Sequence, residues 1–143
     1  MKSLHLLIVV TILSLASPGF PQDAAAKERD KLQGTWQFLR QEYDGTDENS
    51  GESKLVIAGD KMALKDKQGA KSITWKIDPA KQPKTIDLTM DVNGKALQLT
   101  GIYQLDGDTL KICASEAGQA RPTEFASPKG SRLTLFVLKR LKS

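Results

Sequence analysis

The stretch Gly101–Cys113, GIYQLDGDTLKIC, contains a complete β-hairpin signal. Tyr103 and Leu105 alternate with polar residues before the turn, and Leu110 and Ile112 alternate with polar residues after it. Alternation with period two on both sides of an Asp-Gly pair is typical of two half-buried strands joined by a tight turn. This stretch therefore predicts an antiparallel hairpin with one apolar face.

The same design occurs upstream, where Trp75–Asp78 and Thr85–Leu88 flank a longer turn. Asn93-Gly94 is another strong hairpin signal between the two units. We interpret the likeness of the two hairpins as shared turn chemistry rather than as a duplicated function. Together with further apolar runs, the pattern predicts an all-β fold, a roughly eight-stranded antiparallel up-and-down barrel, with a sandwich as the alternative.

Alternation also predicts which side chains face the interior. In the first strand it places Trp36, Phe38 and Arg40 on one face. The predicted inward set is Trp36, Phe38, Leu55, Ile57, Met62, Leu64, Ile73, Trp75, Ile77, Ile86, Leu88, Met90, Leu97, Leu99, Tyr103, Leu105, Leu110, Ile112, Leu133, Leu135 and Val137. These many large side chains favour a filled barrel, although a barrel of this size can also hold one small ligand.

The N-terminus predicts export. Residues 1–16 combine Lys2, the apolar run Leu4–Ala16 and small residues before a break, which is typical of a signal peptide and too short for a membrane anchor. No cysteine lies near the predicted cleavage site to accept a lipid. Residues 17–31 are interpreted as a flexible leader, with one or two helical turns as the alternative, and 32–143 as one domain. The expected location is periplasmic or extracellular.

Composition argues against catalysis. The only histidine, His5, lies in the predicted signal peptide, and Cys113 is the only cysteine. The exported chain therefore lacks the residues for His-dependent catalysis and for the usual zinc, copper and iron sites. The formal charge of +4 falls to +3 without Lys2, and acids and bases are interleaved, which does not favour nucleic-acid binding. We expect a non-enzymatic domain without cofactor or metal.

Five motifs in the domain carry a family resemblance. They are LQGTW at 32–36, DPAKQPKTIDL at 78–88, GIYQLDGDTLKIC at 101–113, RPTEFAS at 121–127 and LFVLKR at 135–140. In combination they resemble an uncharacterised lipocalin-like domain family that is abundant in planctomycete bacteria and often exported. The resemblance covers nearly the whole predicted domain. It implies a lipocalin-like barrel and brings no established ligand or reaction.

Gly34, Trp36 and Arg140 are predicted to close one end of the barrel, with the Arg140 guanidinium packed over the Trp36 ring. If the interior holds a cavity, we expect Trp75 and Tyr103 to line it, because each combines apolar area with one polar atom.

The long connection 115–130 contains Arg121, Glu124 and Phe125, which alternation does not explain. A structural interpretation is a flap in which Phe125 fills a gap and Arg121 pairs with Glu124 or a loop carbonyl. A functional interpretation is the rim of a ligand or partner site.

Two acidic groups have simpler explanations than a site. The loop residues Asp44, Asp47, Glu48, Asn49 and Glu52 could supply oxygen ligands to a cation, but their spacing fits no calcium motif and favours a solvated loop. Asp106 and Asp108 fit turn chemistry.

Two functions follow from these observations. The first is an exported binding module for a small, mostly apolar molecule. The second is a cell-envelope interaction or inhibitor domain with a filled barrel. An interior void of several hundred Å³ favours the first. The sequence does not specify the ligand, partner, oligomeric state, signal cleavage site or accessibility of Cys113.

Overall fold

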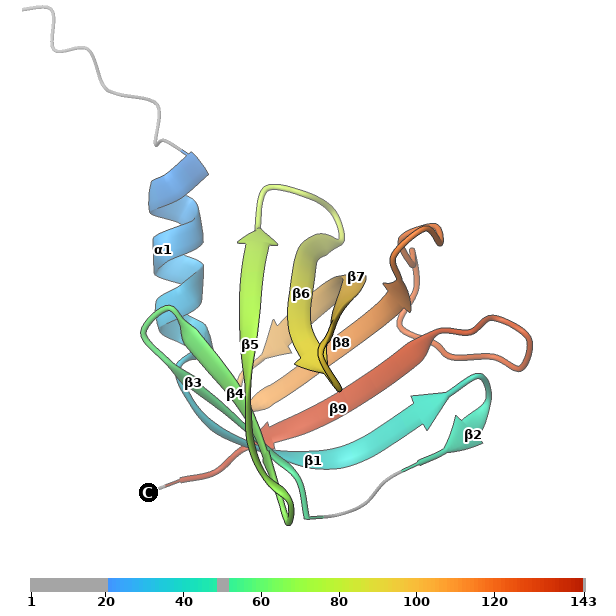
Figure 1. Cartoon of the computed structure of the whole chain (residues 1–143). Coiled ribbons are helices and arrows are strands. Elements are labelled where there is room, and N and C mark those ends of the chain that lie inside the picture. Colours follow the sequence, from blue (N-terminus) through green and yellow to red (C-terminus); the bar gives the residue numbers. More distant parts are fainter. Residues whose placement is uncertain (1–20, 49–51, 143) are drawn as a thin grey trace, which may run out of the picture.

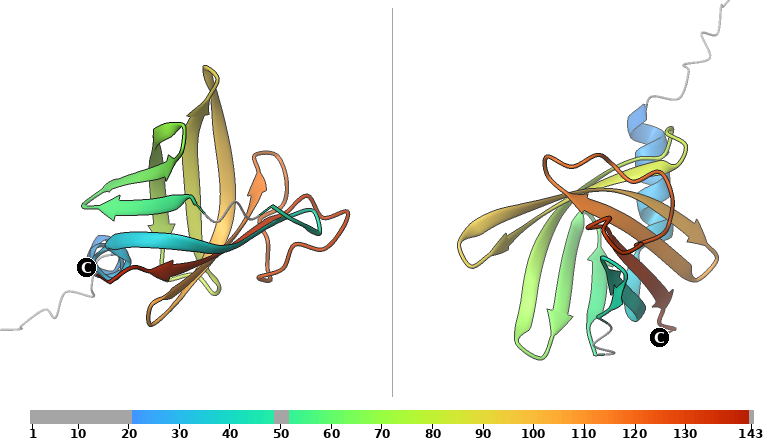
Figure 2. Two further views of the ribbon diagram at one scale, coloured as in Figure 1. Left: turned by 90° about the horizontal axis from the view of Figure 1, so that it is seen from below. Right: turned by 90° about the vertical axis from the view of Figure 1, so that its right-hand side faces the viewer.

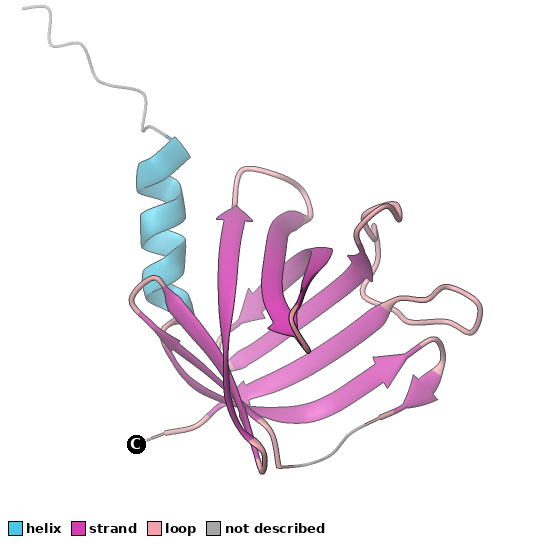
Figure 3. Cartoon of the chain, in the orientation of Figure 1, coloured by secondary structure: helices cyan, strands magenta, loops and turns pink. Residues whose placement is uncertain are grey.

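The computed structural model describes residues 21–48 and 52–142. The predicted signal peptide, the first part of the leader at 17–20 and the loop residue Asn49 lie outside the described residues. One helix, α1 (Pro21–Leu32), precedes the strands (Figures 1 and 3). The strands are β1 (Gly34–Tyr43), β2 (Thr46–Asp47), β3 (Lys54–Ala58), β4 (Lys61–Asp66), β5 (Gly69–Asp78), β6 (Lys84–Val92), β7 (Lys95–Asp106), β8 (Thr109–Glu116) and β9 (Thr134–Arg140).

The strands form a closed barrel in up-and-down order. Each strand from β3 to β9 pairs antiparallel with the next, β1 pairs with β3, and β9 returns to pair with β1. The two-residue strand β2 pairs with the end of β1 and is an addition to the eight barrel strands. Closure gives each of the eight barrel strands a paired neighbour on both sides. The predicted all-β, eight-stranded antiparallel barrel is confirmed.

Turn chemistry explains the order. Asp106 pairs with Thr109 across the tight β7–β8 turn, as the opening hairpin predicts. At the β6–β7 turn, Asn93 and Gly94 have φ of 54° and 81°, the left-handed values that a two-residue hairpin of this kind requires. Local sequence therefore determines which strands are neighbours.

The first correction concerns β9. Leu110 pairs with Leu138 and Ile112 with Phe136, so Phe136 and Leu138 face the interior. The predicted inward residues of this strand, Leu133, Leu135 and Val137, belong instead to a second apolar cluster outside the barrel. The β8–β9 loop runs along the outside of the barrel (Figure 2). Its residue Phe125 packs on the outer cluster, so the strand is apolar on both faces. Alternation in its sequence could not choose between the two faces.

The second correction concerns β1. The pairing of β1 with β9 shifts by one residue between Phe38 and Arg40, a β-bulge. After the shift Gln41 pairs with Phe136 on the inner face, whereas Arg40 is exposed and donates to Glu42. The prediction that Arg40 shares a face with Trp36 and Phe38 was wrong because the bulge inverts the alternation.

The third correction concerns the leader. Residues 21–31 belong to a regular helix, so the flexible interpretation is wrong for them, and the helical alternative is correct in kind although the helix is longer than one or two turns. Glu28 and Leu32 of this helix are buried, and Leu32 is part of the main core. The helix α1 stands against the end of the barrel at which β1 begins and β9 ends (Figure 1). We refer to this as the closed end and to the opposite end as the open end.

Candidate functional site

The closed end is sealed by the first and last barrel strands. The Arg140 guanidinium lies 4.3 Å from the centre of the Trp36 ring, the contact that the sequence predicts. Arg140 also donates to the carbonyl oxygens of Lys31, at 2.6 Å, and Gln33. A Cβ at Gly34, where φ is +130°, would lie 3.3 Å from Arg140 Nη1. A larger residue at position 34 would therefore crowd the guanidinium. Glycine leaves room for the guanidinium to pack over Trp36.

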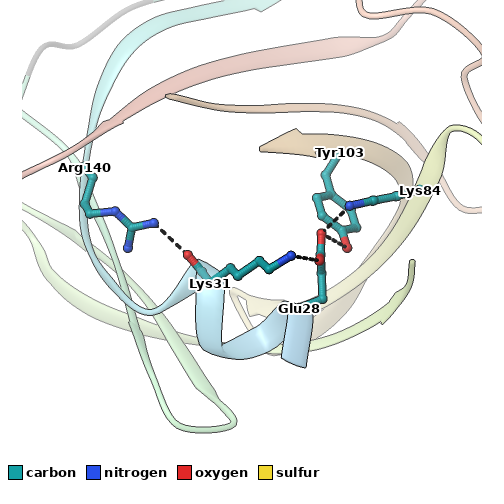
Figure 4. Close-up of polar contacts among 5 residues, drawn as sticks. All are labelled: Glu28, Lys31, Lys84, Tyr103 and Arg140. Carbon is teal, nitrogen blue, oxygen red and sulfur yellow. Dashed lines mark hydrogen bonds and ion pairs between the residues drawn. The ribbon is translucent and has the colours of Figure 1, made fainter. Parts of the chain in front are cut away.

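A buried carboxylate joins α1 to the barrel. Glu28 accepts hydrogen bonds from Lys84 Nζ at 2.6 Å and from the Tyr103 hydroxyl at 3.2 Å, and Lys31 Nζ lies 3.7 Å away (Figure 4). Burial of the carboxyl opposes ionisation, but the hydrogen bond and charge of Lys84 outweigh it, so the pKa of Glu28 lies below its ordinary value. Burial and the Glu28 charge raise the pKa of Tyr103. The pair is therefore a carboxylate and a neutral phenol at neutral pH.

Trp75 and Tyr103 belong to this closed end. The Trp75 indole donates to the carbonyl of Asp60 at 2.9 Å, and Arg29 of α1 lies 5.2 Å from its ring. Neither Trp75 nor Tyr103 lines the cavity at the open end. The prediction that they border an interior cavity is corrected, since their polar atoms are used to close the barrel.

The open end contains a cavity of about 320 Å³. Its inner wall is apolar, and its mouth carries polar side chains from the end of β1, the following loop and the ends of β8 and β9. The lining residues are Phe38, Gln41, Tyr43, Glu48, Ser53, Leu55, Leu64, Ile73, Leu88, Met90, Leu97, Leu99, Ile112, Glu116, Thr134, Phe136 and Leu138.

The two halves of the interior differ in how well they are filled. Toward the closed end, inward residues such as Trp36, Ile86 and Leu110 are buried. Toward the open end, the inward residues Leu97 and Leu99 are only half-buried, although they face the barrel axis. The closed half is filled by Trp36, Trp75, Tyr103 and α1, whereas the aromatic residues described in the open half, Phe38, Tyr43 and Phe136, line a cavity. The result is an apolar surface accessible from the mouth.

The β8–β9 loop lies on the outside of the barrel rather than at this mouth. Arg121 donates to the Gly101 carbonyl at 2.7 Å and pairs with Asp87 at 2.9 Å, not with Glu124, which is exposed. Phe125 packs on the outer cluster. A groove of about 480 Å³ runs beside Arg121, but charged and polar residues of β5, of β6 and of the loop between them form much of its wall. Arg121, Glu124 and Phe125 therefore do not meet Trp75 and Tyr103 in one interior site.

Three searches compare this chain with known proteins. No protein-family model, no curated protein and no solved structure matches it. The resemblance to the lipocalin-like family stays a prediction from the sequence motifs.

Other groups singled out in the sequence have structural partners. Asp108 accepts a hydrogen bond from Arg140 at 3.2 Å, and Asp44 accepts one from the Arg132 backbone N–H at 2.8 Å. Cys113 is fully buried, its thiol donates to the Ala126 carbonyl, and burial raises its pKa. In the described part of the chain, no three His, Cys, Asp or Glu residues gather as a metal site would require.

Among residues 21–48 and 52–142, no helix is both long enough and apolar enough to cross a bilayer.

The sequence predicted the apolar wall better than the mouth. Met90, Leu97 and Leu99 were predicted to face inward, and they line the cavity. Gln41 and Tyr43 were missed because the bulge in β1 turns them inward. Continuing the alternation of β8 from Ile112 by four residues would have found Glu116.

Proposed function

We propose that this protein is an exported, non-catalytic binding module that holds a small, mostly apolar molecule at the open end of its barrel. The observation that carries the proposal is the cavity of about 320 Å³ with an apolar wall and a polar mouth. Binding sites for small molecules have volumes of roughly 300–1,000 Å³ and combine mainly apolar lining with a few polar groups. The sequence of residues 1–16 supports export, and the lack of histidine after His5 supports binding rather than catalysis.

The volume limits the size of the ligand. An apolar cavity of roughly 150 Å³ holds one benzene molecule of six carbons, so this cavity suits about a dozen non-hydrogen atoms. At about 0.5 kcal/mol per atom, between the limits for very small and drug-sized ligands, binding would contribute about 6 kcal/mol. That free energy corresponds to a dissociation constant of roughly 40 μM. A medium-length aliphatic chain or a small ring system fits these limits.

The test is calorimetric titration of the protein with 1-decanol, a neutral molecule of suitable size. We expect one molecule to bind with a dissociation constant in the tens of micromolar. Leu99→Trp fills part of the cavity and should weaken binding at least tenfold, whereas Leu39→Trp adds the same side chain on the exposed face and should leave it unchanged.

Thermal melting of both variants checks that each one is folded. No binding by the parent protein, or equal binding by folded Leu99→Trp, would contradict the proposal. A protein partner that co-purifies in place of a small molecule would favour the interaction-domain alternative.

A further inference from the structure

The side chains that line the cavity carry charge of one sign. Glu48 and Glu116 are the only acidic residues among the described residues of the lining, which include neither lysine nor arginine. Among the described residues, neither carboxylate forms an ion pair with a basic side chain. The remaining polar groups of the mouth, including Gln41 and Tyr43, are neutral. A ligand in the cavity therefore meets an apolar wall and then negative charge.

Strand geometry explains why the lining contains no cation. Without the bulge in β1, alternation from Trp36 and Phe38 would direct Arg40 into the barrel. The bulge turns Arg40 outward, where it pairs with Glu42. The same shift brings the Gln41 side chain inward. The backbone carbonyl of Gln41 accepts a hydrogen bond from the Glu48 backbone N–H at 2.7 Å, which holds Glu48 beside the mouth.

The strand β8 positions Glu116 at the mouth. Glu116 pairs with Leu99, and it lies on the same face as Ile112, which also lines the cavity. Strand alternation therefore directs its side chain toward the cavity at the last residue of the strand. Glu116 and Glu48 come from separate segments, one from β8 and one from the loop after β2.

We infer that the preferred ligand is a cationic amphiphile, with an apolar body of about a dozen non-hydrogen atoms in the barrel and an ammonium group at the mouth. This inference rests on the proposed function, because it assigns a chemical class to the ligand of the same cavity. The positively charged ammonium group donates hydrogen bonds to the two negatively charged carboxylates, and such bonds are stronger than those between neutral groups. An anionic head in the same place would face both carboxylates without a lining cation.

Two lysines lie near the mouth without lining it. Lys71 pairs with Leu64 and Lys95 pairs with Val92, so strand register places both lysines on the cavity-facing side of the barrel, where they are exposed. Neither lysine lines the cavity, whereas an apolar ligand that fills the cavity brings its head group to Glu48 and Glu116. An anion held by these lysines is therefore the competing outcome of the test.

The experiment compares three ligands with one aliphatic chain and different heads, decylamine, 1-decanol and decanoate, at pH 7 and low salt. We expect decylamine to bind about tenfold more tightly than 1-decanol, and decanoate more weakly than both. The preference for the amine should shrink at high salt, because the carboxylates are partly exposed.

Variants locate the effect at the mouth. Glu116→Gln and Glu48→Gln should each weaken decylamine binding about fivefold, the scale of a partly exposed ion pair, and leave 1-decanol binding unchanged. Glu124→Gln removes an acidic residue that does not line the cavity and should change neither affinity. Leu99→Trp should weaken the binding of both ligands at least tenfold, because they share the cavity.

The outcomes separate this inference from the proposed function. If 1-decanol binds in the cavity but decylamine shows no preference, or if decanoate binds best, the inference is wrong and the binding function stands. If none of the three ligands binds, the proposed function itself fails. Loss of the amine preference in Glu124→Gln would also contradict the assignment to Glu48 and Glu116.

Discussion

Replacing Glu28 with alanine removes the carboxylate that connects α1 to the barrel. The Tyr103 hydroxyl, which is buried, then has no carboxylate to accept its hydrogen bond, and an orphaned buried polar group costs about 1–3 kcal/mol. The Lys84 side chain is 41% exposed and can hydrate, so the loss of its ion pair adds only about 0.5 kcal/mol. The higher helix propensity of alanine stabilises the folded state by roughly 0.3 kcal/mol. The expected net loss in the free energy of unfolding is about 2 kcal/mol, or roughly 8 °C in Tm.

Urea denaturation followed by tryptophan fluorescence measures this loss, because Trp36 and Trp75 both lie at the closed end. A double-mutant cycle isolates the contact. Tyr103→Phe alone should cost about 1 kcal/mol, and Glu28→Ala should cost about 1 kcal/mol less in that background, since phenylalanine leaves no hydroxyl without a partner.

The reasoning would be refuted by additive effects within about 0.3 kcal/mol, because additivity means that the two groups do not interact. A loss below about 0.5 kcal/mol in Glu28→Ala would refute it as well, since surface substitutions are usually within that range.

Three further predictions concern the same scaffold. The pKa of Glu28 is lowered in the folded protein, so its contribution to stability is present above its ordinary pKa of 4.5 and is lost as the pH falls through the lowered value; Glu28→Gln should flatten the acid limb of the urea midpoint against pH, and an unchanged limb would exclude this group as its source. Arg140→Lys keeps the charge but loses the planar fork over Trp36, so it should cost about 1–2 kcal/mol in urea denaturation, and full retention of stability would contradict the assigned closure. A Cβ at Gly101 would lie 2.5 Å from the Cys113 carbonyl oxygen, so Gly101→Ala should cost about 3 kcal/mol or prevent folding, whereas a soluble variant with the parent Tm would show that β7 and β8 can separate at this point.

The order of the barrel strands was predictable because it depends on local chemistry. Asp106-Gly107 and Asn93-Gly94 specify tight turns, and alternation on either side specifies which face is apolar. These signals lie within a few residues of each other, so no knowledge of distant contacts is needed.

What the sequence did not predict depends on contacts between distant segments. The outer face of β9 is apolar because Phe125 of the preceding loop covers it, so Leu135 and Phe136 look equally suited to the core. The bulge after Phe38 has no local turn signal and comes from fitting β1 against β9. The bulge determines which residues line the mouth, because it directs the Gln41 side chain inward and the Arg40 side chain outward.

The length and the burial of the helix α1 were not predicted, for a related reason. Its sequence is mostly polar, and its anchors are Leu32 and the charged residue Glu28. A helix held by one buried carboxylate and one buried leucine rather than by an apolar stripe gives little amphipathic signal. Lys84 and Tyr103, the partners that make burial of Glu28 favourable, lie more than fifty residues away.

We propose that an apolar molecule binds inside the open half of the barrel. Methyl NMR during titration with 1-decanol reports directly on the side chains that would contact it. The account predicts saturable shifts of the Met90, Leu97 and Leu99 methyl signals, which line the cavity, while Ile102 and Leu135 of the outer cluster stay unchanged. Shifts confined to the outer cluster, or no shifts at saturating 1-decanol, would contradict it.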